Sequence, residues 1–111
     1  MPDPKRLKFV GTAYDGLMGF PREVRREAGF QLDRVQCGRE PHDWKPMNTV
    51  GSGVQEIRLR DESGAFRVVY VAKLAGAVYV LPCFQKKTQK TDQRDLDLAA
   101  KRYRELLKEL T

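Results

Sequence analysis

Apolar and polar residues alternate with a period of two in the middle of the chain. Val54–Arg60 places Ile57 and Leu59 on one side and charged residues on the other, and Ala65–Lys73 alternates in a similar way. Alternation of this kind indicates strands that turn one face toward a core. The run Asp61–Gly64 between them is rich in turn-forming residues, so the two segments are predicted to form a β-hairpin.

A denser apolar run begins at Val78 and predicts a third strand of this meander, over Val78–Phe84, with both faces covered. Lys86, Lys87 and Lys90 follow it closely. The pattern therefore places a cluster of positive charge at the end of a core strand, and phosphate is its natural ligand. The alternative interpretation is that these lysines are ordinary solvated charges.

Helical spacing appears on both sides of the meander. Phe20-Pro21 suits the start of a helix, and Gly38 suits a left-handed C-cap. Gly29 leaves open the alternative of two shorter helices. A last helix is predicted from Thr91 or Asp92 to about Glu109. The predicted apolar stripes are Val24, Ala28, Leu32 and Val35 in the first region, and Leu96, Ala99, Tyr103, Leu106 and Leu110 in the last helix.

The remaining segments complete a small α+β domain over residues 1–111. Lys5–Val10 is predicted as an edge strand with Leu7 and Phe9 facing inward, Tyr14–Met18 as a short helical turn, and Arg39–Gly53 as a loop. The expected architecture is a curved, mainly antiparallel sheet of about four strands, with helices packed on one face and a C-terminal helix. The other face is expected to be partly open and to carry Arg58, Arg60 and Arg67.

Composition narrows the function classes. The net charge of +6 favours an acidic partner such as nucleic acid, an acidic protein or a membrane surface. No apolar run approaches the roughly 18 residues of a membrane span, and the charged N-terminus is not followed by the apolar segment of a signal peptide. Cys37 and Cys83 lack metal-ligand spacing, and Cys83 is expected to be a small buried residue. A cytoplasmic protein is therefore expected.

Arg67 is the most informative single residue, because it lies between Phe66 and Val68 in a predicted strand. One interpretation is an ion pair with Glu56 across the hairpin. The other is an arginine on the open face whose planar fork of donors binds a phosphate, with Arg58 beside it.

The loop residues His42 and Trp44 admit two interpretations as well. Trp44 is either an anchor for its loop or a stacking platform for a nucleobase. The sequence contains no Ser-His-Asp pattern, no paired carboxylates at an apolar site, no phosphate-binding glycine loop and no metal-ligand set.

Three strand segments and a helix together resemble a known family. They are Gly53–Arg58, Gly64–Tyr70, the run Val80–Thr91 with its Phe-Gln-Lys-Lys-Thr-Gln-Lys-Thr phrase, and the helix that contains Ala99. The combination resembles the phage-derived HigB-like toxins of the RelE/ParE superfamily, which belong to bacterial type II toxin–antitoxin modules. The resemblance covers about Phe20–Leu106.

This resemblance implies an endonuclease that cleaves mRNA, commonly on the ribosome, without a metal or cofactor. The ribose 2′-hydroxyl attacks the adjacent phosphate, so the protein must orient it, take its proton and stabilise the phosphoryl charge. By correspondence with the family, Arg67 would hold the scissile phosphate with help from Arg58. Lys86 and Lys87 would stabilise the transition state. The predicted RNA-binding residues are Arg60, Trp44, Lys73 and Lys90.

One residue departs from the family pattern. Many relatives carry histidine at the position of Pro82, so the proton-transfer group is left open, with a lysine or Tyr70 as candidates. Pro82 also cannot donate to a ladder, which argues for a strand end or an edge.

The resemblance implies a separate helix-turn-helix antitoxin as partner, and contact with operator DNA only through that antitoxin. Two alternatives from other classes remain open at this point. One is a ParE-like inhibitor of DNA gyrase, and the other is a basic nucleic-acid-binding module without catalysis.

Overall fold

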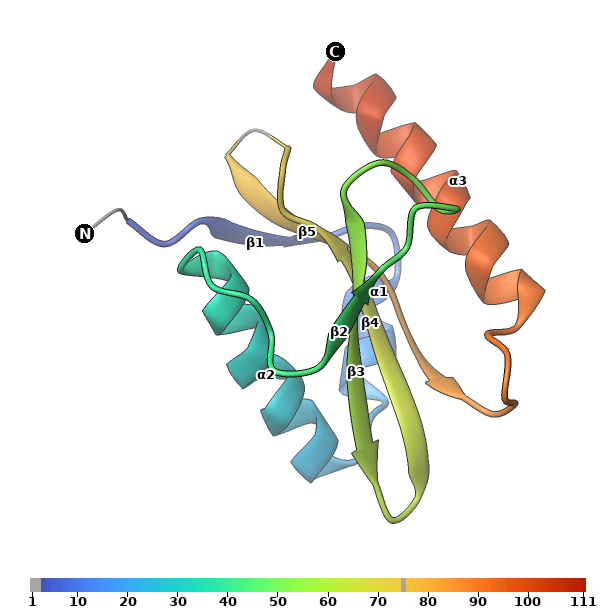
Figure 1. Cartoon of the computed structure of the whole chain (residues 1–111). Coiled ribbons are helices and arrows are strands. Elements are labelled where there is room, and N and C mark those ends of the chain that lie inside the picture. Colours follow the sequence, from blue (N-terminus) through green and yellow to red (C-terminus); the bar gives the residue numbers. More distant parts are fainter. Residues whose placement is uncertain (1–2, 75) are drawn as a thin grey trace.

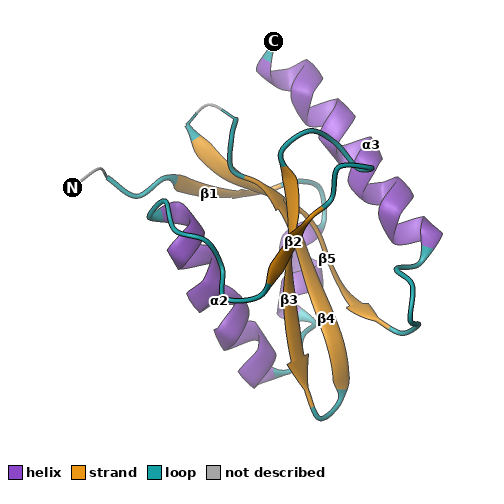
Figure 2. Cartoon of the chain, viewed as in Figure 1, coloured by secondary structure: helices purple, strands orange, loops and turns teal. Residues whose placement is uncertain are grey.

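The computed structural model describes residues 3–74 and 76–111 and shows one sheet between helices (Figure 1). The elements in chain order are β1 (Arg6–Phe9), α1 (Ala13–Met18), α2 (Arg22–Gln36), β2 (Trp44–Pro46), β3 (Val54–Asp61), β4 (Gly64–Val71), β5 (Ala77–Lys86) and α3 (Gln93–Leu110). The strand order is β1-β5-β4-β3-β2. Helices α1 and α2 cover one face, and α3 packs on the other (Figure 2).

The α+β class, the meander and the mainly antiparallel sheet are confirmed, and β1 pairs with β5 in parallel at the edge. The sheet has one strand more than expected, because β2 forms where a loop was predicted. A strand of three residues that ends in Pro46 is too short to show a period of two. The C-terminal helix lies on the face opposite α1 and α2, so it covers part of the face that was expected to be open.

The first predicted helix is a single element, and the alternative of two shorter helices is wrong. Gly29 is exposed in its middle with nothing near the place of a Cβ. The helix is stopped two residues beyond Gln36 by Gly38, whose φ is +83°. The amide of Gly38 donates to Val35 O at 3.0 Å and that of Arg39 to Arg34 O at 2.9 Å, which is the bonding pattern of a Schellman motif.

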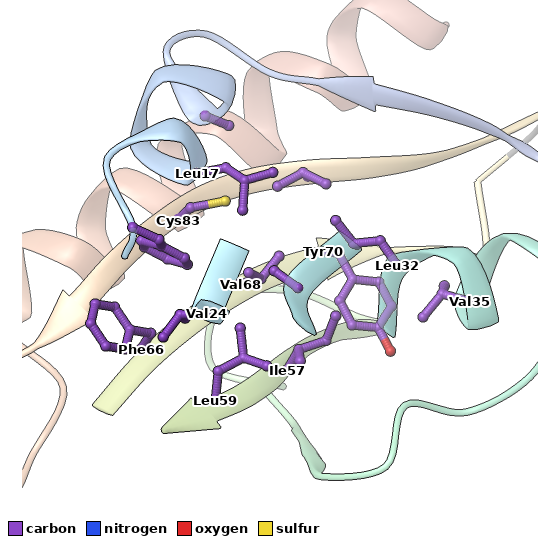
Figure 3. Close-up of a cluster of buried hydrophobic side chains, with 14 of the residues drawn as sticks. Leu17, Val24, Leu32, Val35, Ile57, Leu59, Phe66, Val68, Tyr70 and Cys83 are labelled. Carbon is purple, nitrogen blue, oxygen red and sulfur yellow. The ribbon is translucent and has the colours of Figure 1, made fainter. Parts of the chain in front are cut away.

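Two buried clusters hold the layers together. The first lies between the sheet and helices α1 and α2, and Figure 3 shows its side chains converging from both layers. It includes Val24, Ala28, Leu32 and Val35, which are the predicted stripe. The second lies under α3, where Ala99 and Leu106 are buried. Leu110, which was predicted to join that stripe, is 45% exposed because it stands at the helix end.

Strand β5 contains an irregularity that changes which of its side chains face α3. On β4, Val68 pairs with Cys83 and Tyr70 with Val80, so β5 has one extra residue between these pairs. Such a β-bulge tolerates proline. Even-numbered Val78 and Val80 face the first cluster before the bulge, and odd-numbered Cys83 does so after it.

Pro82 lies within this bulge and not at a strand end, because β5 continues to Lys86. The expected edge is present, since β1 pairs with β5 only as far as Val80. Arg102 of α3 donates from Nη1 to Leu81 O at 2.6 Å and from Nη2 to Thr12 Oγ1 at 2.7 Å. The last helix thereby supplies the hydrogen bond that a neighbouring strand would otherwise give to the bulge.

Helix α1 approaches β5 so closely that only glycine fits at position 16. A Cβ built there lies 2.5 Å from Cys83 O, which is backbone and cannot rotate away. The Cys83 thiol is buried in the same contact, and burial raises its pKa to about 12.

Gly16→Ala is expected to lower the free energy of unfolding by about 1–3 kcal/mol, because α1 must move off β5. Gly29→Ala is the matched control. It is expected to raise stability by roughly 0.5–1 kcal/mol, because alanine favours the helix and meets open space. Urea titration followed by circular dichroism measures both, and equal midpoints for the two variants would contradict the close contact.

Candidate functional site

Cationic side chains from three adjacent strands meet on the sheet face that α3 leaves uncovered. Arg58 on β3 and Arg67 on β4 are direct partners in the ladder, and Lys86 on β5 is the partner of Ala65, two residues from Arg67. They line an open depression of about 440 Å³, referred to here as the cationic depression. Its lining residues are Arg58, Arg60, Ala65, Arg67, Lys86, Lys87, Thr88 and Gln89.

The strand pattern and the bulge together select these side chains. Directly opposed residues of an antiparallel pair share a face, so Arg58 and Arg67 point the same way. After the bulge, Phe84 belongs to the cluster on the α3 side, so Lys86, two residues later, projects from that side too. If β5 had no bulge, the side chains of Gln85 and Lys87 would lie on this face in place of Lys86.

A buried carboxylate lies next to the arginines. Glu56 is 1% exposed and Arg67 4% exposed, and Arg67 Nε lies 3.4 Å from Glu56 Oε1. Lys45, the cross-strand partner of Glu56 on β2, places Nζ 3.8 Å from the same oxygen. Of the two interpretations of Arg67, the ion pair with Glu56 is therefore confirmed, and phosphate binding stays a prediction. Glu56 offsets the repulsion between Arg58 and Arg67, which face each other directly.

This pair does not use all of its hydrogen-bonding capacity. Arg67 Nη1 donates to Phe66 O at 3.0 Å. Glu56 Oε2 and Arg67 Nε have no hydrogen-bond partner among the residues that the structure describes, so the Nε–Oε1 contact is an ion pair without hydrogen-bond alignment. Buried charged groups are costly when they are incompletely bonded, so this pair holds Arg67 in place at a cost in stability.

The environment lowers the pKa of two cations. Burial lowers the pKa of Arg67 and Glu56 opposes this, while an arginine remains charged at neutral pH. Desolvation lowers the pKa of Lys86, and the charges of Arg67, Lys45 and Arg58 lower it further against the opposing effect of Glu56. Lys86 therefore releases its proton more readily than an ordinary lysine.

Two other predicted RNA contacts lie at or beside the cationic depression. Arg60 lines it, and Lys90 lines a second depression next to it. Lys73 follows the far end of β4 and lines a separate hollow with Lys5 and Arg39. Trp44 pairs with Ile57, whose side chain belongs to the α2 side. The structure therefore does not bring Trp44 or Lys73 to the cationic depression.

Tyr70, the candidate for proton transfer other than a lysine, and His42, the one histidine of the sequence, both lie elsewhere. Tyr70 is buried on the α2 side, where its hydroxyl donates to Gln55 Oε1 at 2.6 Å and burial raises its pKa. His42 contacts Gln31, through a 3.0 Å ring contact and a 2.8 Å backbone hydrogen bond. The lysine candidates, Lys86 and Lys87, are thus the ones that the structure places at the depression.

Sequence reasoning missed Lys45 as a member of this cluster and treated Glu56 only as a possible partner of Arg67. Their ladder contact depends on β2, whose three residues carry no periodic signal. Lys45 and Pro46 lie in the middle of the predicted loop Arg39–Gly53, where no pattern of apolar residues marks a strand.

Within residues 3–74 and 76–111, no three His, Cys, Asp or Glu side chains gather as a metal ion would require. None of the described helices is long and apolar enough to cross a membrane.

Comparisons with known proteins identify the family of the chain and its fold. Residues 15–104 match the family described as phage derived protein Gp49-like (DUF891). The fold is similar to that of a mutant of the E. coli toxin RelE in the free state, with a TM-score of 0.63, 13% identity, and coverage of 93% of this chain and 98% of that one. At 13% sequence identity, this similarity shows the fold alone. No curated protein matches the sequence.

Glu56→Gln is expected to lower the free energy of unfolding by about 3 kcal/mol, because it leaves the buried Arg67 without a counter-charge. Replacing both partners, as Glu56→Leu with Arg67→Met, is expected to restore most of this loss. Denaturant titration measures each variant. Glu23→Gln, which removes an exposed pair with Arg26, is the control and should change stability by less than about 0.5 kcal/mol. Equal effects at positions 56 and 23 would contradict the buried pair.

Proposed function

The chain belongs to the phage-derived Gp49-like family and has a RelE-like fold, and we propose that it is the toxin of a type II toxin–antitoxin pair. Its proposed activity is endonucleolytic cleavage of mRNA on the ribosome, which stops translation. The observation that supports this best is the cationic depression, where Arg58, Arg67 and Lys86 project from neighbouring strands around one buried carboxylate.

In the proposed mechanism the 2′-hydroxyl of the substrate attacks the adjacent phosphorus, the bond from phosphorus to the 5′-oxygen of the next nucleotide breaks, and no metal takes part. A 2′,3′-cyclic phosphate forms, and the leaving 5′-oxygen takes a proton from the ammonium group of Lys87 or from water. The guanidinium groups of Arg58 and Arg67 bind the non-bridging oxygens and stabilise the charge that grows there. Glu56 does not line the depression and acts by holding Arg67 in place. Lys86 and Lys87 bind the phosphate or the leaving oxygen.

Pro82 leaves the identity of the proton acceptor open, because the family that the sequence resembles often has histidine at this position. The lowered pKa of Lys86 makes a fraction of neutral amine available, and a neutral amine can accept the proton of the 2′-hydroxyl. We therefore assign this role to Lys86.

The partner required by this proposal is an antitoxin, which we expect to be a separate helix-turn-helix protein that brings the pair to operator DNA. Both proteins would act in the cytoplasm.

Induction of the unmutated chain in bacteria is expected to arrest growth and to produce new mRNA 5′ ends in primer extension. Arg58→Met and Lys86→Met should reduce cleavage at least about 100-fold, the scale of losing one stabilising group at a developing charge. Both side chains lie at the surface of the fold, so these variants should remain folded. Lys108→Met, at the exposed end of α3, should cleave like the parent.

Intact mRNA together with accumulated DNA breaks would replace this proposal by gyrase inhibition. RNA binding that weakens steeply with salt but never leads to cleavage would replace it by a non-catalytic binding module.

The pH dependence separates the two roles of Lys86. Because the pKa of Lys86 is lowered, RNA affinity should fall as pH rises on the alkaline side of neutrality, where Lys86 loses its charge before an ordinary lysine would. The cleavage rate at saturating RNA should rise over the same window because neutral amine accumulates. Lys86→Arg should retain affinity and lose the rise in rate. A rate profile of Lys86→Arg that parallels the parent would show that another group accepts the proton.

A further inference from the structure

A second depression adjoins the cationic one and differs from it in chemistry. It encloses about 610 Å³ between the segment after β2, the residues that follow β5 and the start of α3. Lys86 and Gln89 line both depressions, so the two form one continuous surface. We call the second one the amide depression. Its lining residues are Lys45, Pro46, Met47, Asn48, Thr49, Lys86, Gln89, Lys90, Thr91, Gln93 and Leu96.

Besides Lys45, Lys86 and Lys90, the amide depression offers groups that suit a nucleobase. Pro46, Met47 and Leu96 contribute apolar surface, while Asn48 and Gln89 present exposed amides. An amide offers a donor and an acceptor side by side, which matches the hydrogen-bonding edge of a base. The cationic depression, in contrast, offers almost only donors, which suit phosphate oxygens.

The wall formed by the loop after β2 is held firmly against α3. A Cβ at Gly51 would lie 2.3 Å from Tyr103 Cε2, and the Tyr103 hydroxyl donates to Ser52 O at 3.0 Å. The amide of Met47 donates to Val54 O at 2.8 Å. A wall fixed in this way presents Asn48 without a large loss of entropy on binding.

We propose that the amide depression is a subsite for one unpaired base of single-stranded RNA, next to the phosphate held in the cationic depression. Asn48 and Gln89 are its specificity-determining residues. Contacts to the phosphate fix the position of the strand and contacts to the base provide the selectivity, so the two depressions divide these tasks. This inference rests on the proposed function in taking RNA as the ligand.

The test uses short single-stranded RNAs whose 2′-hydroxyls are methylated, so that they cannot be cleaved, and in which one base at a time is removed. Fluorescence anisotropy at low salt gives the affinity of each. Removal of one particular base is expected to weaken binding to the unmutated protein by roughly 5- to 100-fold.

The variant Asn48→Ala/Gln89→Ala should bind the intact RNA about as weakly as the unmutated protein binds the RNA without that base. Removing the base should then cost the variant little more, because the two changes delete the same interaction. Gln85→Ala is the matched control. Gln85 is an exposed amide near the end of β5, four residues before Gln89, and it lines a hollow beside Phe66 on the α2 side.

An equal penalty for base removal in the double variant and in the unmutated protein would overturn the subsite, as would the absence of any sensitive base. Neither result bears on cleavage of unmodified RNA, which is measured separately. If a base penalty is found without cleavage, the subsite stands and the proposed nuclease fails. If cleavage is found without a base penalty, the nuclease stands and the subsite fails. Failure to bind RNA at all would overturn both.

Discussion

The ion pair between Glu56 and Arg67 is the interaction on which the arrangement of the site depends. Without the carboxylate, a buried arginine would face Arg58 directly across the ladder, which is an unfavourable placement of like charges. With it, three adjacent strands can carry cations on one face and still pack. The same carboxylate attracts Lys45 and thereby attaches the short edge strand β2 to the site. The Glu56–Arg67 ion pair thus both stabilises the sheet and allows the cations to gather on one face.

The bulge in β5 connects this cluster to the helices. Its extra residue reverses the facing of every later side chain in the strand, so Lys86 joins the arginines. Arg102 donates to the carbonyl at Leu81, and Gly16 permits α1 to close on Cys83. Helices from both faces therefore hold the irregular segment. Proline at position 82 is compatible with this geometry because the strand has no partner on its β1 side at that point.

Much of the fold followed from local pattern. The alternation in β3 and β4, the stripe in α2 and the left-handed cap at Gly38 were all predicted, because each reflects a period or a backbone preference within a few residues. The short strand β2 and the placement of α3 were not. The three residues of β2 are too few to show a period. An amphipathic stripe indicates that a helix buries one side, but it does not indicate which face of the sheet the helix covers.

For the candidate site, the sequence by itself determined which cations exist and that Arg58 and Arg67 share a face, since both follow from a period of two in a hairpin. It also held the family resemblance that the comparisons confirmed. Only the tertiary structure decided that Lys86 faces the arginines, that Lys45 and Glu56 join them, and that Trp44 and Lys73 lie elsewhere. These outcomes depend on ladder register, on one extra residue in β5 and on contacts between segments far apart in the chain, none of which leaves a local periodic signal.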